Sequence, residues 1–380
     1  MVESTVCLGV RIHRSEAQLI HDVLLESSFI DSTLLPLKFD DDSICFPLLS
    51  SSEHAIPLQT LLDSYPSMAL ERCTFSKKSK QQSPQIQLQE LVQTFALSSH
   101  GNVEDLKLGI PEKWERLGQL LLFPKNAFEG EAWSNFLETH GQDFWHEVAK
   151  MFNVTSIGKQ QPIAPNQTRD AQVRMLLGKS WVEFKQHQVY FGFDAAKVMF
   201  SSGNITERER MAKLEVTNEV ILDVYAGIGY YTLPIAVHGA PKKIHAFEIN
   251  PLSIQGLTWG IQQNNVGHIV EVHEGDNRQL LPQFFQSADR CILGLLPSSS
   301  AVWELCFDCL KQRGGVLHIH MNVEEERIEL WMKETIDYFQ TLSARRGRQA
   351  TITATHLEKV KWYAPRIRHV VLDLDVDYSS

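Results

Sequence analysis

Long apolar runs and complete metal-ligand motifs are absent from the sequence. In a chain of 380 residues, no stretch reaches the roughly 18 consecutive apolar residues that a membrane-spanning helix needs. The six cysteines are scattered, and the CxxC pair of Cys306 and Cys309 has no second pair to complete a zinc site. The N-terminus has early acids and no apolar core, so we expect no signal peptide. These features predict a cytoplasmic protein with reduced core thiols, and neither a membrane nor a metal is expected.

Positive charge is also scarce overall, because the formal net charge is −10. This balance argues mildly against nucleic acid as a partner. A local exception lies between residues 345 and 368, where seven basic residues stand against the single acid Glu358. A basic stripe can bind phosphates whatever the total charge, although a solvated strand and loop fits the same pattern.

The rhythm of the chain suggests three domains. Residues 1–100 alternate short apolar runs with polar turns and read as a small α/β or α+β accessory domain, with a polar surface loop at 75–84. Residues 101–210 read as a middle domain. It begins helix-rich, passes through a turn-rich joint at 161–170 and ends in strands, for which Gly178 and Lys179 suit a hairpin turn. Residues 211–380 form the third domain.

From Val220 onward, strands alternate with helical stretches, which is typical of βαβ units in a parallel sheet. Two late strands without a helix between them are expected to pair antiparallel at one edge. We therefore predict an α/β fold, with a Rossmann-like C-terminal domain of the class I methyltransferase type. The predicted strands are EVILDVYA (219–226), KKIHAFEIN (242–250), IVEVHEGD (269–276), RCILGLLP (290–297), GGVLHIHM (314–321), ATITATHLEKVKWYAP (350–365) and RIRHVVLDLDV (366–376).

A GxG motif follows the first of these strands, in the segment DVYAGIG that runs from Asp223 to Gly229. Glycines there let the backbone turn tightly and approach a ligand closely, and the carboxylate of Asp223 can accept from a ligand amine. Gly227 is the first glycine of the pair. A third glycine, which the dinucleotide fingerprint for NAD expects, is missing.

Polar residues also end the next two strands. Glu248 ends the second strand, where an acid typically binds both ribose hydroxyls of an adenosine. Asp276 and Asn277 end the third strand, where a carboxylate or amide can read the adenine amino group. The three successive strand ends predict adenosine binding. The missing glycine and the antiparallel tail favour S-adenosylmethionine over NAD, and the lack of a Walker lysine disfavours ATP.

Several motifs, in order, resemble one family closely. It is the tRNA wybutosine-synthesising aminocarboxypropyl transferases, relatives of the tRNA guanine-37 N1-methyltransferases. The resemblance covers roughly residues 105–375, whereas residues 1–100 match more loosely. The matching segments are IPEKWERLGQLLLFP (110–124), FDAAKVMFSSGNITERERM (193–211), LDVYAGIGYYTLPIA (222–236), FEINPLS (247–253), EGDNR (274–278), LGLLPSS (293–299), HIHMN (318–322) and KWYAPRIRHVV (361–371).

The resemblance implies an enzyme that transfers the 3-amino-3-carboxypropyl group of S-adenosylmethionine, and not its methyl group. The implied acceptor is a carbon of the 4-demethylwyosine base at position 37, in the anticodon loop of tRNA(Phe). It also implies that Ser201 contacts the methionine moiety of the cofactor and that Arg208 clamps its carboxylate. The middle domain then serves as a tRNA-binding or linker domain.

The fourth strand end, LGLLPSS with Pro297, is expected to face the cofactor. It lacks the asparagine that base-methylating relatives often carry there, which fits a carbon nucleophile and leaves the general base unassigned. His318 and His320 face one side of their strand, either as core histidines or as lining of the acceptor pocket with Asn322. A two-histidine metal site needs further ligands, which the sequence analysis does not find.

Two alternatives remain open at this point. One is a tRNA guanine-37 N1-methyltransferase of the same fold, and the other is a catalytically idle tRNA-binding module with a decayed cofactor site. The missing asparagine argues against the first, and the intact acids Asp223, Glu248 and Asp276 argue against the second. For the tRNA, Trp362 and Tyr363 within the basic stripe offer rings that stack on a flipped base, although Trp362 fits strand packing equally well.

Overall fold

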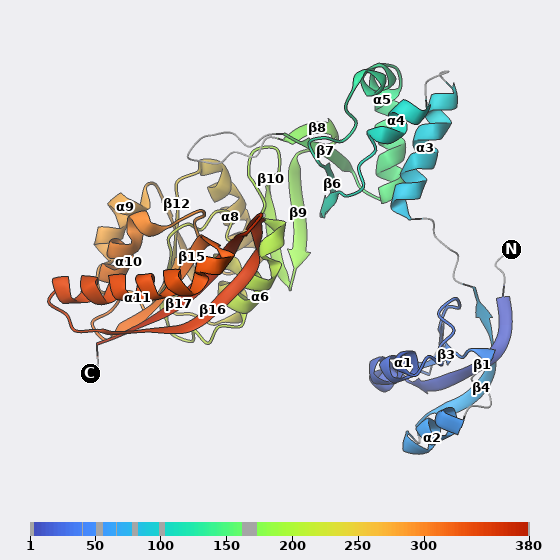
Figure 1. Ribbon diagram of the computed structural model, residues 1–380, viewed down its shortest axis with the longest axis horizontal. Coiled ribbons are helices and arrows are strands. Elements are labelled where there is room, and N and C mark those ends of the chain that lie inside the picture. The colour runs from blue at the N-terminus through green and yellow to red at the C-terminus, as the bar shows by residue number, and fades with distance from the viewer. Residues whose placement is uncertain are drawn as a thin grey trace. The chain divides into compact units, whose positions relative to one another are not determined.

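The computed structural model describes residues 4–39, 41–50, 56–65, 67–77, 83–98, 103–161 and 173–378 (Figure 1). The chain forms two compact units, Met1–Ser83 and Pro84–Ser380. Most of the loop predicted at 75–84 and most of the joint predicted at 161–170 lie outside the described residues. In the part that is described, no helix combines the length and the apolar character that crossing a bilayer requires.

The first unit is an antiparallel sheet with two helices, which is the α+β arrangement among the two that the sequence suggested. Alternate residues of the first strand, Val10 and Ile12, are buried and belong to one core with Ile20 and Leu24 of the first helix. Ile20 and Leu24 are four residues apart, so they share one face of that helix. The sheet order is β2-β3-β1-β4, with β1 at Ser4–His13, β2 at Leu37–Lys38, β3 at Ser43–Pro47 and β4 at Ala69–Ser76, and the helices are α1 (Ala17–Glu26) and α2 (Ile56–Ser64).

The second unit begins with helices packed on a small sheet of order β5-β6-β7-β8. An aromatic core that includes Trp133, Phe144 and Trp145 fills the space between them. The sequence analysis placed its first boundary at residue 100, whereas the first compact unit ends at Ser83, because α3 packs into this aromatic core. The elements are α3 (Pro84–Ser98), α4 (Val103–Leu108), α5 (Glu131–Phe152), β5 (Glu115–Leu117), β6 (Leu120–Phe123), β7 (Ser156–Gln160) and β8 (Val173–Leu177).

The prediction of a hairpin turn at Gly178 and Lys179 is wrong. Strand β8 pairs with β7, and the hairpin forms one step later, between β9 (Trp181–Gln186) and β10 (Val189–Asp194). Its turn residues, His187 and Gln188, both have positive φ, as the tight turns of two-residue hairpins require. Strand β7, with which β8 pairs, was not predicted from the sequence.

A seven-stranded sheet dominates the second unit, with the order β13-β12-β11-β14-β15-β17-β16. The first five strands in sequence run parallel, and β17 inserts antiparallel between β15 and β16. The predicted α/β class and the antiparallel edge hairpin are therefore confirmed. The strands are β11 (Val220–Asp223), β12 (Lys243–Glu248), β13 (Val270–Glu274), β14 (Arg290–Leu293), β15 (Gly314–Glu324), β16 (Thr351–Ala364) and β17 (Ile367–Asp377).

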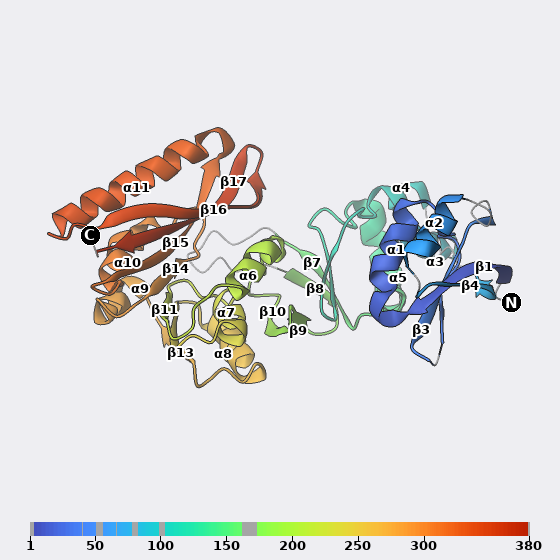
Figure 2. The same ribbon diagram turned by 90° about the horizontal axis from the view of Figure 1, so that it is seen from below.

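Helices cover both faces of this sheet (Figure 2). Ile244 on β12 packs into one core with α7 (Thr232–His238) and α8 (Pro251–Gln263). Phe247, three residues further along the strand, packs into the other core with α10 (Trp303–Cys309) and α11 (Ile328–Arg345). Buried residues on the two faces explain why these strands read as near-continuous apolar runs. Cys306 and Cys309 are buried free thiols in the second core, as predicted. The helices are α6 (Ile205–Ala212), α7 (Thr232–His238), α8 (Pro251–Gln263), α9 (Asn277–Leu280), α10 (Trp303–Cys309) and α11 (Ile328–Arg345).

Candidate functional site

A cavity of about 490 Å³ opens where the parallel strands β11, β12, β13 and β14 end. Ligands of open α/β sheets bind at this carboxyl edge. Five of the eight residues that the sequence analysis proposed as cofactor contacts line the cavity, namely Gly227, Glu248, Asp276, Asn277 and Pro297. They come from four different loops, so the fold gathers them from distant parts of the chain.

The glycine loop after β11 needs its glycines. Gly227 has φ +56° and Gly229 has φ +93°, which is a region that other residues rarely adopt. A Cβ on Gly229 would lie 2.6 Å from the side chain of Leu233, which is too close for a real contact. The loop therefore holds its backbone against the cavity and against α7 at the same time.

Glu248 sits at the tip of β12 with its carboxylate held by backbone amides. Its Oε2 accepts from Gly227 N at 2.7 Å, and its Oε1 accepts from Asn250 N at 2.8 Å and from Ile249 N at 3.0 Å. Burial raises the pKa of Glu248, while the three amide donors oppose that rise. An ionised carboxylate offers about four acceptor positions, so room for a ligand hydroxyl remains.

Asp276 and Asn277 end the loop after β13. Asp276 caps α9 by accepting from Arg278 N at 3.0 Å, and it also accepts from the guanidinium Nε of Arg278 at 2.9 Å. The hydrogen bond from Arg278 lowers the pKa of Asp276, so this carboxyl group is ionised at neutral pH. Asn277 donates from Nδ2 to the carbonyl of Val224 at 2.7 Å, which ties the start of α9 to the residue that follows β11.

Asp223 does not line the cavity, because it is fully buried beneath the glycine loop. Its Oδ2 accepts from the hydroxyl of Thr232 at 2.7 Å, and its Oδ1 has no hydrogen-bond partner among the described residues. Burial raises the pKa of Asp223 to about 6. The unpaired oxygen is a feature that a ligand donor would satisfy.

Arg208 and Ser201 do not line the cavity either. Arg208 donates from Nε to Gln186 Oε1 and from Nη1 to Ser201 O, both at 2.9 Å. Its Nη2 is buried without a partner among the described residues. The Ser201 hydroxyl accepts from Lys361 Nζ at 2.8 Å, which fastens this loop to β16.

The loop after β14 presents apolar and hydroxyl groups to the cavity. Leu295, Leu296 and Pro297 line it, and neither an amide nor a carboxylate side chain occurs between residues 293 and 299. The hydroxyl of Ser298 donates to Ser300 at 3.0 Å. This loop therefore provides no strong side-chain acceptor for an amine proton.

His318 and His320 are core residues and do not line the cavity. His318 lies 2.6 Å from Asp373 and 2.7 Å from Arg290, inside a buried network of charges. His320 Nδ1 lies 3.0 Å from His369 Nε2, and burial lowers the pKa of His369 to about 4. Of the two readings that the sequence left open, the structure supports the core histidines.

Much of the basic stripe is engaged in ion pairs. Arg346 pairs with Asp308 at 2.9 Å, and Lys359 and Arg368 both pair with Glu325 at 2.7 Å. Trp362 keeps 53% of its side chain exposed, with the Arg368 guanidinium 3.6 Å from its ring centroid. The stripe is thus a mixed surface with one exposed indole, and its net positive charge is smaller than its composition suggests.

The sequence analysis missed several residues that line the cavity. Tyr225 and Tyr230 flank the glycines, and Tyr230 donates from its hydroxyl to the carbonyl of Met199. Asn250 lines the wall just beyond Glu248 and caps α8 by accepting from Leu252 N at 2.9 Å. Their nearness in sequence to Gly227 and Glu248 was the signal that could have found them.

Known proteins resemble this chain in both sequence and structure. Residues 182–349 match the TRM5/TYW2 methyltransferase domain. A zebrafish (Danio rerio) protein named tRNA wybutosine-synthesizing protein 2 homolog is 33% identical over 96% of this chain and 98% of its own length. The crystal structure of Pyrococcus horikoshii TYW2 in complex with MeSAdo is 27% identical, with a TM-score of 0.61 over 78% of this chain and 100% of that one.

The Arabidopsis thaliana protein named tRNA wybutosine-synthesizing protein 2/3/4 is 36% identical over 83% of this chain. The match covers 31% of that longer protein, so this chain spans about a third of its length. The zebrafish relative, in contrast, is matched over nearly its whole length. The chain therefore belongs to the family of tRNA wybutosine-synthesizing protein 2.

Proposed function

We propose that this chain transfers the 3-amino-3-carboxypropyl group of S-adenosylmethionine to a carbon of the 4-demethylwyosine base at position 37 of tRNA(Phe). The observation that carries the proposal is the cavity at the strand ends, which brings Gly227, Glu248, Asp276 and Asn277 together. Family membership supports the same reaction, and the MeSAdo bound by a related structure supports a sulfur-containing adenosine in this cavity.

Different residues around the cavity bind different parts of the cofactor. Glu248 accepts from a ribose hydroxyl through the acceptor position that the three amides leave open. Asp276 and Asn277 read the adenine amino group. This division follows the general rule that an acid at the second strand end binds the ribose.

The methionine arm goes to groups that do not line the cavity. The unpaired Nη2 of Arg208 is a donor for the arm's carboxylate, and the hydroxyl of Ser201 contacts the same moiety. Asp223 keeps one unpaired oxygen for the ammonium group and holds the glycine loop through Thr232. Arg208 Nη2 and Asp223 Oδ1, the two buried atoms without a partner among the described residues, therefore each gain a ligand group of opposite charge.

The reaction is a displacement at a carbon attached to the sulfonium. The base carbon forms a bond to the γ-carbon of the arm, the bond from that carbon to sulfur breaks, and 5′-methylthioadenosine leaves with the electron pair. The base carbon then loses its proton to water or to a nearby carboxylate. The methyl carbon is bonded to the same sulfur, so orientation within the cavity decides which group moves.

The loop after β14 favours carbon alkylation over guanine N1-methylation. An amine nucleophile is helped by a side-chain acceptor, and residues 293–299 contain neither an amide nor a carboxylate. Methylation of guanine 37 by the same fold is the second candidate. The two reactions leave different nucleosides behind, namely 5′-methylthioadenosine and S-adenosylhomocysteine.

For the tRNA, we assign the anticodon loop as the bound region and Trp362 as a stacking platform beside it. The exposed indole and the neighbouring Tyr363, also 53% exposed, offer two aromatic faces next to Lys361 and Arg368. Unpaired RNA bases stack on such side chains. The cytoplasmic location suggested by the sequence stays a prediction.

Chromatography of the spent cofactor tests the proposal. The enzyme is incubated with S-adenosylmethionine and hypomodified tRNA, and the nucleosides are separated. We expect 5′-methylthioadenosine in step with modified tRNA. Accumulation of S-adenosylhomocysteine would establish the methyltransferase alternative, and failure of the cofactor to bind in equilibrium dialysis would revive the idle tRNA-binding module.

A further inference from the structure

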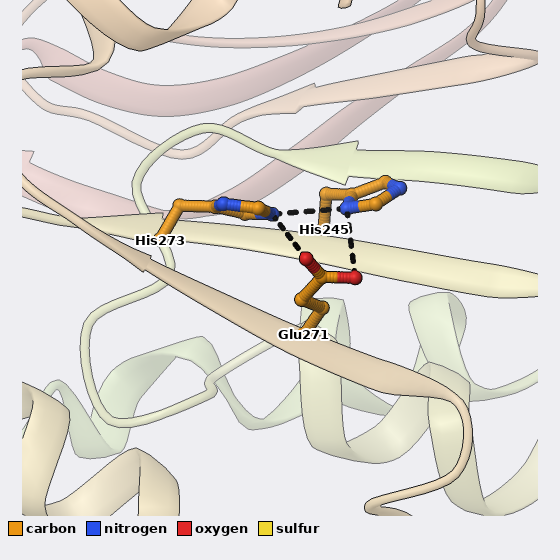
Figure 3. A group of neighbouring side chains, drawn as sticks. All are labelled: His245, Glu271 and His273. Carbon is orange, nitrogen blue, oxygen red and sulfur yellow. Dashed lines mark hydrogen bonds and ion pairs between the residues drawn. The ribbon is translucent and has the colours of Figure 1, made fainter.

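Three side chains with metal-binding atoms meet on the face of strands β12 and β13 (Figure 3). His245 lies directly opposite Glu271 in the parallel register, and His273 is the next residue on the same face of β13. Figure 3 shows the two imidazoles and the carboxylate turned toward one common point. Strand β13 is the outermost strand of the sheet, so this cluster joins an edge strand to its only neighbour in the sheet order.

The distances within the cluster suit a tetrahedral metal. His245 Nδ1 lies 2.9 Å from His273 Nε2. Glu271 Oε2 lies 3.9 Å from His245 Nδ1, and Glu271 Oε1 lies 3.9 Å from His273 Nε2. Zinc binds imidazole nitrogen and carboxylate oxygen at about 2.0–2.2 Å, which places two tetrahedral ligands about 3.4 Å apart. The nearest contacts, at 2.9 and 3.9 Å, differ from that value by about 0.5 Å. One ligand atom from each residue lies within 4.8 Å of the other two, so rotation of the side chains brings the three atoms to one ion.

The donor set is also chemically suitable. A neutral imidazole has one ring nitrogen with the lone pair that a metal needs. The 2.9 Å contact between His245 Nδ1 and His273 Nε2 is a hydrogen bond, so one ring changes its tautomer when the ion binds. Two histidines and one glutamate are the protein ligands of several zinc sites, in which water fills the fourth position. Imidazole and carboxylate together favour zinc over the hard cations calcium and magnesium.

Aromatic packing fixes the two imidazoles in place. The ring of Phe284 lies 4.8 Å from His245 and 5.1 Å from His273 by centroid, and Phe247 stacks on His273 at 4.8 Å. The Glu271 side chain is 50% exposed, so an ion can reach the cluster from solvent. Such support orients ligands before the ion arrives.

One neighbour opposes a cation. Lys243 Nζ lies 3.2 Å from Glu271 Oε2. Its positive charge weakens binding of a divalent ion, although it leaves Oε1 of Glu271 free for coordination. This residue therefore provides a test in which removal of a side chain strengthens the interaction.

We propose that His245, Glu271 and His273 form a zinc-binding site that clips the edge strand β13 to β12. No metal was predicted from the sequence, because neither the cysteine pair Cys306 and Cys309 nor the histidine pair His318 and His320 has further ligands in the sequence pattern. The site lies on the same sheet face as Phe247, a residue that also lines the cavity and whose ring stacks on His273. The zinc therefore holds the strand that carries Asp276 at its end, and it takes no part in the displacement.

Calorimetric titration of the chelator-treated full chain with zinc sulfate tests the site. Wild type is expected to bind one equivalent, and H273Q is expected to lose at least tenfold in affinity. E271Q changes a half-exposed side chain, which protects the test against misfolding, and it should also lose at least tenfold. The matched control is H356Q, which alters an exposed histidine 3.1 Å from Glu358, a pair that has no third potential ligand among the described residues.

Lys243→Met should tighten zinc binding about tenfold, because it removes the opposing charge. Zinc should also raise the melting temperature of wild type and leave that of H273Q unchanged, since a ligand stabilises only a fold that binds it. Equal zinc affinity in wild type, H273Q and E271Q would overturn the proposal. So would a loss of affinity in K243M, because the charge argument would then have the wrong sign.

Discussion

Glu248 Oε2 accepts a hydrogen bond of 2.7 Å from the backbone amide of Gly227. This contact joins the tip of β12 to the glycine loop that follows β11, so the acid and the loop form one wall of the cavity. The same carboxylate accepts two further hydrogen bonds, from the backbone amides of Ile249 and Asn250 at the start of the next loop. Its position is therefore set by the backbone before any ligand binds, which is the preorganisation that tight binding requires.

Glu248→Gln should weaken S-adenosylmethionine binding at least tenfold, or about 1.4 kcal/mol. A glutamine amide places a donor against backbone donors and loses charge-assisted acceptance from the ribose. Calorimetric titration measures the change. The matched control is Glu274→Gln, an exposed acid at the end of neighbouring β13 that does not line the cavity. Unaltered affinity in E248Q would remove the ribose assignment.

Arg208→Lys should weaken S-adenosylmethionine about tenfold and leave 5′-methylthioadenosine binding unchanged, because only the former carries the arm's carboxylate. Lysine keeps the charge and loses the planar fork. Competition between the two nucleosides measures the difference. The control is Gln186→Ala, which removes a partner of Arg208 Nε and leaves the guanidinium in place. Equal loss for both nucleosides would indicate a structural role alone.

Asp223→Asn should stabilise the ligand-free protein above pH 6 by up to about 3 kcal/mol. Burial raises the pKa of Asp223 from its ordinary 3.8 to about 6. Between these two pH values the carboxyl group is protonated in the folded state and ionised in the unfolded state. In wild type this contribution to stability is present at low pH and is lost as the pH rises through about 6. Urea unfolding at pH 5 and pH 8 should show this decrease, and the variant should lack it. An identical pH dependence in both proteins would contradict the assignment.

Trp362→Ala should weaken tRNA binding about tenfold, since a base stacked on an aromatic ring contributes about 1–3 kcal/mol. Cofactor affinity should not change, because Trp362 does not line the cavity. Filter binding with labelled tRNA measures the effect. Phe285→Ala is the control, because this ring is also exposed, at 44%. If both variants bound tRNA equally well, the stacking surface would lie elsewhere.

The C-terminal sheet was predictable because its signals are local and repeated. Each parallel strand is a short apolar run, each is followed by a helical stretch, and the polar residues come directly after the strands. Glu248 and Asp276 could be placed at one edge from this pattern alone. The fold and family read from the sequence are confirmed, whereas the roles of the individual site residues stay predictions.

The features that were not predicted from the sequence depend on contacts between segments that are distant in the chain. Strand β7 is five residues long and follows directly on a long amphipathic helix, so its pattern merged with the helix. The burial of Asp223 and Arg208 depends on how the loops close over them. The contact between His245 and His273 depends on the register of two neighbouring strands, which cannot be read from the sequence.

A double-label experiment tests the central claim most directly. The enzyme is supplied with S-adenosylmethionine labelled either in the carboxyl carbon or in the methyl carbon, together with hypomodified tRNA(Phe), and radioactivity in the recovered tRNA is counted. We predict that the carboxyl label enters the tRNA and that the methyl label stays with the released nucleoside. Transfer of the methyl label with no carboxyl label in the tRNA would contradict the account.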